Sequence, residues 1–275
     1  MPTMIDAMTP ITSIGKLPDA VVEARNTLGV ERLWFRGQPN PKQQLCAWID
    51  RIENGRKIEA NLFDRFRDHA PLRGPDCPNH DDRPAWLPLM RHHGLYTRLL
   101  DWSSSMLVAC FFAVEEQHAR NCNRDKQECH ESDGEIWALA PGKLNARFGY
   151  PKLIIPIDGD VVRPQFDAMF MVQVGENEPE EAQKVLAVHA RQVSPRMVVQ
   201  QGEFTIHGIR SPLEDIISAE GDPFLLRFTV PANEKPLVRK ELYDMGIHKS
   251  QLFPDLDYLA EALNREALGS SQIAG

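Results

Sequence analysis

The most constraining feature of the sequence is an uninterrupted apolar run from Met106 to Val114, closed by Glu115 and Glu116. The run is far shorter than the roughly 18 apolar residues that a membrane-spanning helix needs, so we expect no membrane association. Three serines at 103–105 precede it, and serine is a preferred N-cap residue. We therefore expect a buried helix that begins at residue 106 and is apolar on nearly all sides.

Around this helix, hydrophobic patterns predict helices first, then mostly strands, then two further helices. Helices are expected at 12–28, 48–69, 86–91, 235–245 and 254–267, strands at 32–36, 135–140 and 224–230, and a strand or hairpin at 197–207. A turn at 37–39 should end the first strand. Strands and helices do not alternate regularly, which favours an α+β fold over a doubly wound α/β fold.

The length of 275 residues allows one or two domains, at about 150 residues each. No linker is visible, so we expect one compact domain over 1–275, with an N-terminal helical segment at 12–70, a core at 86–231 and C-terminal helices at 235–267. The formal net charge of -8 argues against sequence-independent nucleic-acid binding, although a local basic groove could still hold such a ligand.

The cysteines indicate a reducing compartment. Their number is odd and they are scattered, which is typical of free thiols in a cytoplasmic protein; they are Cys46, Cys77, Cys110, Cys122 and Cys129. The N-terminus lacks the basic start and apolar run of a signal peptide. Two Cys/His groups, one at 122–130 and one at 77–80, lack the paired CxxC spacing of structural zinc sites, so we expect no metal.

Polar residues gather in three blocks. The first is the sequence WFRGQ, in which Arg36 stands beside Gly37 and Gln38 near the end of a strand. An arginine there can grip a phosphate or carboxylate through its guanidinium fork, or it can be a structural partner of a buried carboxylate. Both interpretations stay open.

The second block runs from residue 91 to 105 and precedes the apolar helix. A structural interpretation pairs Arg98 with Asp101 and uses the serines as caps, because a charge beside a buried helix needs a partner. A site interpretation adds His92 or His93 as ligand donors and an anion at the helix N-terminus.

The third block, QQGEFTIHG at 200–208, is expected to be an alternating strand. On such a strand Gln201 and Glu203 share one face and Gln200 points to the other. An exposed strand face is the ordinary interpretation of each of these residues, and His207 alone is more often structural than catalytic.

These blocks together resemble the FRG domain, whose pattern combines FRGQ, a block like HHGxxTRLLDW with hydroxyls and an apolar helix, a QGxF strand and a C-terminal GIxxxLFPDLD stretch. The matching segments here are FRGQ at 35–38, HHGLYTRLLDWSSSMLVACFFA at 92–113, QQGEF at 200–204 and GIHKSQLFPDLD at 246–257. The resemblance implies a bacterial or phage-associated protein of toxin or defence type.

The same blocks carry a weaker resemblance to Arg-Ser-Glu ADP-ribosyltransferases, through residues 35–37, the serines ahead of Ala109–Ala113, and the strand bearing Glu203. It implies a split β-sheet fold and NAD as co-substrate. Breaking the nicotinamide–ribose bond builds an oxocarbenium-like cation, which a carboxylate stabilises as in glycoside cleavage.

By this resemblance the catalytic residues are Arg36 on the pyrophosphate, Ser103 on the ribose and Glu203 on the cation. The other residues expected to bind NAD are Gly37, Gln38, His92, His93, Arg98, Ser104, Ser105 and Gln201. The acceptor would be an unidentified macromolecule, either protein or nucleic acid. Two alternatives remain: a non-catalytic binding module of the same fold held by a partner such as an antitoxin, and an NAD hydrolase with water as acceptor.

Overall fold

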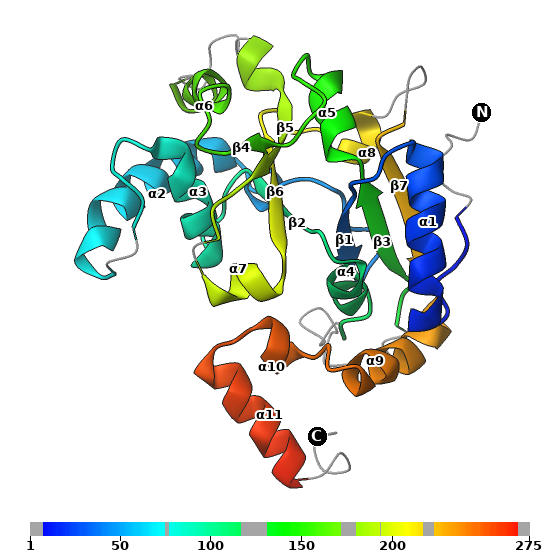
Figure 1. The fold of residues 1–275 in the computed structure, drawn as a ribbon. Coiled ribbons are helices and arrows are strands. Elements are labelled where there is room, and N and C mark those ends of the chain that lie inside the picture. Colours follow the sequence, from blue (N-terminus) through cyan, green and yellow to red (C-terminus); the bar gives the residue numbers. More distant parts are fainter. Residues whose placement is uncertain are drawn as a thin grey trace.

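The computed structural model describes residues 8–74, 77–116, 131–171, 180–192, 194–216 and 223–268. These residues form an α+β fold in which helices flank one mixed sheet of seven strands (Figure 1), as the sequence predicts. The strands are β1 (Trp34–Gln38), β2 (Leu99–Ser103), β3 (Gly134–Leu139), β4 (Ile155–Pro156), β5 (Val185–His189), β6 (Gly202–His207) and β7 (Leu225–Val230). Their order is β4-β5-β6-β2-β1-β3-β7, and every neighbouring pair is antiparallel except β4–β5.

The helices are α1 (Leu17–Leu28), α2 (Gly55–His69), α3 (Arg83–His92), α4 (Met106–Ala113), α5 (Pro141–Arg147), α6 (Val162–Met171), α7 (Pro195–Val199), α8 (Leu213–Ile216), α9 (Lys235–Asp244), α10 (Lys249–Leu252) and α11 (Leu256–Leu268). Some helices differ in extent from the predicted ranges: α1 begins at Leu17 rather than at residue 12, whereas α3 is longer than the predicted 86–91. Short 3-10 helices occupy 14–16, 48–51, 70–72, 180–183 and 232–234. The helix expected at 48–69 is therefore split, because residues 52–54 separate a 3-10 turn from α2.

The apolar run forms α4, and Ser105 caps it as expected, since its Oγ accepts a hydrogen bond from the Val108 amide at 3.4 Å. The helix lies directly against β1. A Cβ at Gly37 would overlap the carbonyl oxygen of Ala109 and lie 2.6 Å from the amide nitrogen of Ala113. Only glycine permits this approach, so β1 continues through Gly37 and Gln38, where the sequence pattern predicts a turn.

The sheet has a weak joint between β1 and β2. These strands share a single register pair, Phe35 with Ser103, whereas β1 pairs with β3 along its whole length. The sheet therefore has two well-paired parts, β4-β5-β6-β2 and β1-β3-β7, which meet at this register pair. Beyond it, β1 and β2 separate. Two apolar clusters support the sheet. The one around α1 and α4 includes Leu100 and Trp102 of β2 together with residues of β1, so it spans both parts, whereas the one around α2, α3 and α6 contacts β2, β4, β5 and β6.

The strand or hairpin expected at 197–207 is instead a helix followed by a strand. Ser194 caps α7, its Oγ accepting from the Met197 amide at 3.2 Å, and Pro195 occupies the first helical position. Gln200 ends the helix, and Gln201 has a φ of 47°, in the left-handed region. The alternation of faces predicted for residues 200 and 201 is therefore wrong, and β6 begins only at Gly202.

No helix within the described ranges is long and apolar enough to cross a membrane. Cys46 and Cys110 are buried free thiols, and Cys77 is a partly buried one. In the same ranges no group of three potential ligands is arranged to hold a metal ion. Cys122, Cys129 and His130, which the sequence places close together, lie outside the described residues.

Substituting Gly37 by alanine should destabilise the fold, because the new methyl group would force the backbone of α4 off β1. Overpacking of a core costs about 1–3 kcal/mol, and backbone atoms can yield less than side chains. Urea unfolding followed by circular dichroism measures the change. The matched control is Gly74→Ala, since nothing lies within 4 Å of a Cβ at Gly74. Equal stability of the two variants would contradict the close packing.

Candidate functional site

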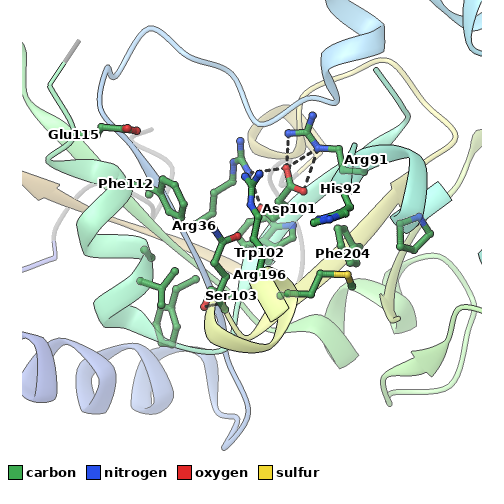
Figure 2. Close-up of a pocket in the computed structure, with 18 of the residues that line it drawn as sticks. Arg36, Arg91, His92, Asp101, Trp102, Ser103, Phe112, Glu115, Arg196 and Phe204 are labelled. Carbon is green, nitrogen blue, oxygen red and sulfur yellow. Dashed lines mark hydrogen bonds and ion pairs between the residues drawn. The ribbon is translucent and has the colours of Figure 1, made fainter. Parts of the chain in front are cut away.

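A cleft with a volume of about 470 Å³ opens where β1 and β2 separate. Its floor is formed by β1, β2 and the start of β6, and its walls by α3, α4, α7 and the loop after β1 (Figures 1 and 2). Two kinds of residue line the cleft. The aromatic ones are Phe35, Trp48, Trp102, Phe112 and Phe204, and the charged or polar ones are Arg36, Gln43, Arg91, His92, Asp101, Ser103, Glu115, Arg196 and Gln200.

Asp101 lies at the centre of the cleft between two arginines (Figure 2). Arg91 on α3 donates through Nε to both carboxylate oxygens, at 3.1 and 3.0 Å, and through Nη2 to Oδ2 at 2.7 Å. Burial alone would raise the pKa of Asp101, but the charge and hydrogen bonds of Arg91, aided by Arg36, hold that pKa below its usual range. Asp101 therefore stays ionised, and Arg91 ties α3 to β2.

Arg36 spans the opening between the two strands. Its Nη1 donates to the main-chain oxygen of Asp101 at 2.6 Å and lies 3.9 Å from the carboxylate Oδ2. The break in the pairing of β1 with β2 leaves this main-chain oxygen of Asp101 without a partner from the neighbouring strand. The Arg36 side chain satisfies it instead. Burial lowers the pKa of Arg36 to about 10, against the raising effect of Asp101, so the group remains a cation at neutral pH. The structural and ligand-binding interpretations of Arg36 are therefore compatible.

Arg196 on α7 is the cleft cation with the fewest protein partners. Its guanidinium carbon lies 4.4 Å from the ring centre of Phe253, and within the described ranges it forms no ion pair with a carboxylate. Its charge contributes to the lowered pKa values of Asp101 and His92. Arg36 and Arg91 share Asp101, so Arg196 supplies the positive charge that an anionic ligand can use.

His92 lines the cleft at the end of α3, and its Nδ1 lies 3.2 Å from the Oγ of Ser194. Burial lowers the pKa of His92, and His93 and Arg196 lower it further, while Asp255 opposes them. The imidazole is therefore mainly neutral at pH 7 and can donate or accept a hydrogen bond. His93 itself is exposed, does not line the cleft and packs against the ring of Phe66 at 6.1 Å.

The structure brings four of the residues predicted for the site into the cleft and leaves seven outside. Inside lie Arg36, Gly37, His92 and Ser103; outside lie Gln38, His93, Arg98, Ser104, Ser105, Gln201 and Glu203. The hydroxyls expected to hold a ribose already have partners: Ser103 Oγ donates to the Gln200 oxygen at 2.7 Å, and Ser104 Oγ donates to Gln201 Oε1 at 3.0 Å. Gln38 is buried and accepts from Trp137 Nε1 at 3.0 Å.

Glu203 does not share the cleft with Arg36. Successive residues of β6 point to opposite faces, and Phe204 faces the cleft, so Glu203 faces the other side of the sheet. There its Oε2 lies 2.9 Å from the Nδ1 of His189. Burial raises the pKa of Glu203, partly offset by His189. Its position gives no support to a catalytic role in this cleft, where the carboxylates among the described lining residues are Asp101 and Glu115.

The predicted ion pair between Arg98 and Asp101 is wrong. Arg98 points away from the cleft into the core, where its Nη2 and Nε each lie 2.8 Å from Glu59 Oε2, and its main-chain amide donates to Oε1 at 2.6 Å. Both residues are almost completely buried, and the Arg98 guanidinium stacks on Phe170. Arg98 is therefore a structural residue that anchors the start of β2 to α2.

Sequence reasoning missed Arg196 and gave Gln200 no place in the site. Interpreting 197–207 as a strand or hairpin concealed the helix that presents both side chains to the cleft. The signal that could have found them is the Ser194-Pro195 pair, since serine at the N-cap and proline at the first position are a helix start.

The fold and cleft define an α+β protein with a polar, aromatic-walled pocket at a break in its sheet. Residues 31–122 match the family model of the FRG domain, which supports the resemblance seen in the sequence. The match includes β1, α3, β2 and α4, which supply most of the cleft, whereas α7 and β6 lie beyond it. No curated protein and no solved structure matches the chain.

Breaking the buried ion pair should cost much stability. In the Glu59→Gln variant the Arg98 guanidinium stays buried without its counter-charge, a situation that destabilises proteins by about 3–5 kcal/mol. Urea unfolding of the wild type and variant measures this loss. Arg163→Gln, which removes an exposed pair with Asp160, is the control and should change little. A Glu59→Gln protein as stable as this control would refute a structural role for Arg98.

A second buried group, His207, lies on the sheet face opposite the cleft. Its Nε2 lies 2.9 Å from Thr205 Oγ1, which also accepts from Trp102 Nε1 at 3.1 Å. Burial, and then the charges of Arg56 and Arg36, lower the pKa of His207 from 6.5 to about 3. The folded protein therefore holds this imidazole neutral.

Acid should destabilise the protein through His207. The unfolded chain binds a proton near pH 6.5 and the folded chain only near pH 3, so the stabilising contribution is complete above 6.5 and is lost as the pH falls between these values. Each extra proton costs about 1.4 kcal/mol per pH unit. Urea unfolding at stepped pH values measures this slope, and histidine NMR should find the ring neutral at pH 5. A protonated His207 in the folded protein at that pH would contradict the prediction.

Proposed function

We propose that the cleft binds NAD and that the chain is an NAD-dependent ADP-ribosyltransferase. The observation that carries this proposal is Arg196, a cation without a carboxylate partner among the described residues, in a cleft walled by aromatic rings. Arginine forks suit the oxygens of a diphosphate, and an aromatic residue of the lining such as Phe112 suits the adenine or nicotinamide ring. His92 and Gln200 add neutral hydrogen-bonding groups for ribose hydroxyls.

The opening of the sheet between β1 and β2 agrees with the split sheet that the ADP-ribosyltransferase resemblance implies. Arg36, the arginine of the aromatic-Arg-Gly strand, stands at this opening. Residues 31–122 supply this part of the cleft.

In the proposed reaction the bond between nicotinamide and ribose C1′ breaks, and its electron pair leaves with nicotinamide. A nucleophilic oxygen or nitrogen of the macromolecular acceptor then bonds to C1′ and loses its proton to solvent or to neutral His92. We assign the stabilisation of the intervening cation to Asp101, because it is ionised, fixed by Arg91 and exposed to the cleft. A fixed negative charge beside developing positive charge lowers the barrier.

The alternative is a nucleotide-binding module that does not turn NAD over. It is favoured by one observation: two arginines already compensate the charge of Asp101, and Glu203 faces away from the cleft. Under either proposal a toxin or defence role, with an antitoxin as partner, would appear as growth arrest on expression that the Arg196→Ala substitution relieves.

Two measurements test these functions: the first shows whether the protein binds NAD, and the second shows whether it turns NAD over. Calorimetry with NAD should give saturable binding, weakened about 10- to 100-fold in Arg196→Ala because a charge-assisted hydrogen bond is lost. Arg163→Ala, an exposed arginine outside the cleft lining, should bind as the wild type does. Absence of NAD binding by the wild type would refute both functions.

Turnover is tested with NAD labelled in the adenylate half and a cell extract. Label transferred to protein or nucleic acid supports the transferase, free ADP-ribose alone indicates a hydrolase, and binding without nicotinamide release indicates the module. Asp101→Asn should keep NAD binding within a few-fold and lower turnover by about 100-fold or more. If Asp101→Asn keeps full turnover while Glu203→Gln loses it, our assignment of the carboxylate is wrong.

A further inference from the structure

The C-terminal segment reaches the cleft through one aromatic ring. Phe253, which follows α10, lies with its ring centre 4.4 Å from the guanidinium carbon of Arg196. The ring is 8% exposed, and two other rings hold it, Phe112 edge-on at 6.1 Å and Tyr258 at 5.0 Å. Phe112 and Arg196 both line the cleft, so Phe253 contacts one aromatic residue and one cation of the cleft lining.

A second contact joins the same two segments. The side chain of Gln200, at the end of α7, donates from Nε2 to the main-chain oxygen of Leu252 at 2.9 Å. Leu252 is buried, so this acceptor has a fixed position. Figure 1 shows α10 lying next to α7, with α11 extending beyond it. The two polar side chains that α7 presents to the cleft, Arg196 and Gln200, are thus both held by the C-terminal segment.

We infer that Phe253 is a positioning residue for ligand binding, which holds the Arg196 guanidinium over its ring and aimed into the cleft. An arginine side chain has large rotamer freedom, and fixing it only when a ligand arrives lowers affinity. A planar guanidinium stacked on a ring is already oriented, and within the described residues Arg196 forms no ion pair that would hold it elsewhere. The inference rests on the proposed function, because it takes Arg196 as the anion-binding residue. It extends the site to residue 253, beyond residues 31–122 that match the FRG model.

The test compares Phe253→Leu, which removes the ring and keeps an apolar side chain, with Phe253→Tyr, which keeps the ring. We expect Phe253→Leu to raise the Kd for NAD about 3- to 10-fold, which is the range of a cation–ring contact. Phe253→Tyr keeps the ring and should bind NAD with the Kd of the wild type. Thermal unfolding of each variant verifies that it is folded. An unchanged Kd in a folded Phe253→Leu protein would overturn the inference.

A double-mutant cycle shows whether Phe253 acts through Arg196. In an Arg196→Ala background, Phe253→Leu should have no further effect on the Kd for NAD, because the group that it positions is gone. If the two effects multiply instead, Phe253 supports the cleft only by packing and the inference is wrong.

One measurement does not depend on the identity of the ligand. In the wild type the Arg196 Nε–Hε NMR signal should be shifted by the ring current of Phe253 and have the relaxation of an ordered group. Phe253→Leu should abolish the shift and increase the mobility. If the wild type does not bind NAD but its Arg196 signal shows this shift and order, the proposed function is wrong and the positioning of Arg196 by Phe253 still holds. A mobile Arg196 in the wild type overturns the positioning, whatever the result with NAD.

Discussion

The contact of Arg36 with Asp101 decides how the two parts of the sheet meet. Beyond the single pair of Phe35 with Ser103, β1 and β2 separate, and a main-chain oxygen at the opening loses its ladder partner. Arg36 satisfies that oxygen, and Arg91 fixes the carboxylate of the same residue from α3. Water weakens these ion pairs because the side chains are partly exposed, so their main effect is geometric. Three segments, β1, β2 and α3, thus meet at one aspartate.

Much of the architecture follows from local patterns. The apolar run between Ser105 and Glu115 indicated a buried helix, and the strands at β3 and β7 agree with their predicted ranges within a residue. Each of these elements carries a strong apolar pattern in the sequence, and that pattern identifies it. The sequence predicts neither a helix nor a strand at α6 or β5, because the patterns of these short segments are compatible with either structure.

The candidate site was harder to predict, because it depends on long-range partners. Arg91 and Arg98 both precede Asp101 in the sequence, and no local pattern indicates which of them pairs with it. The choice is made by Glu59, which lies 39 residues before Arg98 and takes it into the core. Glu203 shows the same limit. Alternation predicts that it and Phe204 face opposite ways, but only the pairing of Phe204 with Asp101 determines which of them faces the cleft.

The balance of charge in the cleft also bears on the size of its ligand. The chain as a whole carries a formal charge of -8, which repels a long polyanion approaching from a distance. At physiological ionic strength that repulsion is screened over about 8 Å, so within the cleft the nearby arginines dominate. Arg36 and Arg91 are partly neutralised by Asp101, which leaves Arg196 as the main attraction. Glu115 also lines the cleft, so the three described lining arginines against two carboxylates leave one net positive charge. One such charge among aromatic residues suits a compact anion with rings, such as a dinucleotide, better than an extended nucleic-acid backbone, which needs many phosphate contacts.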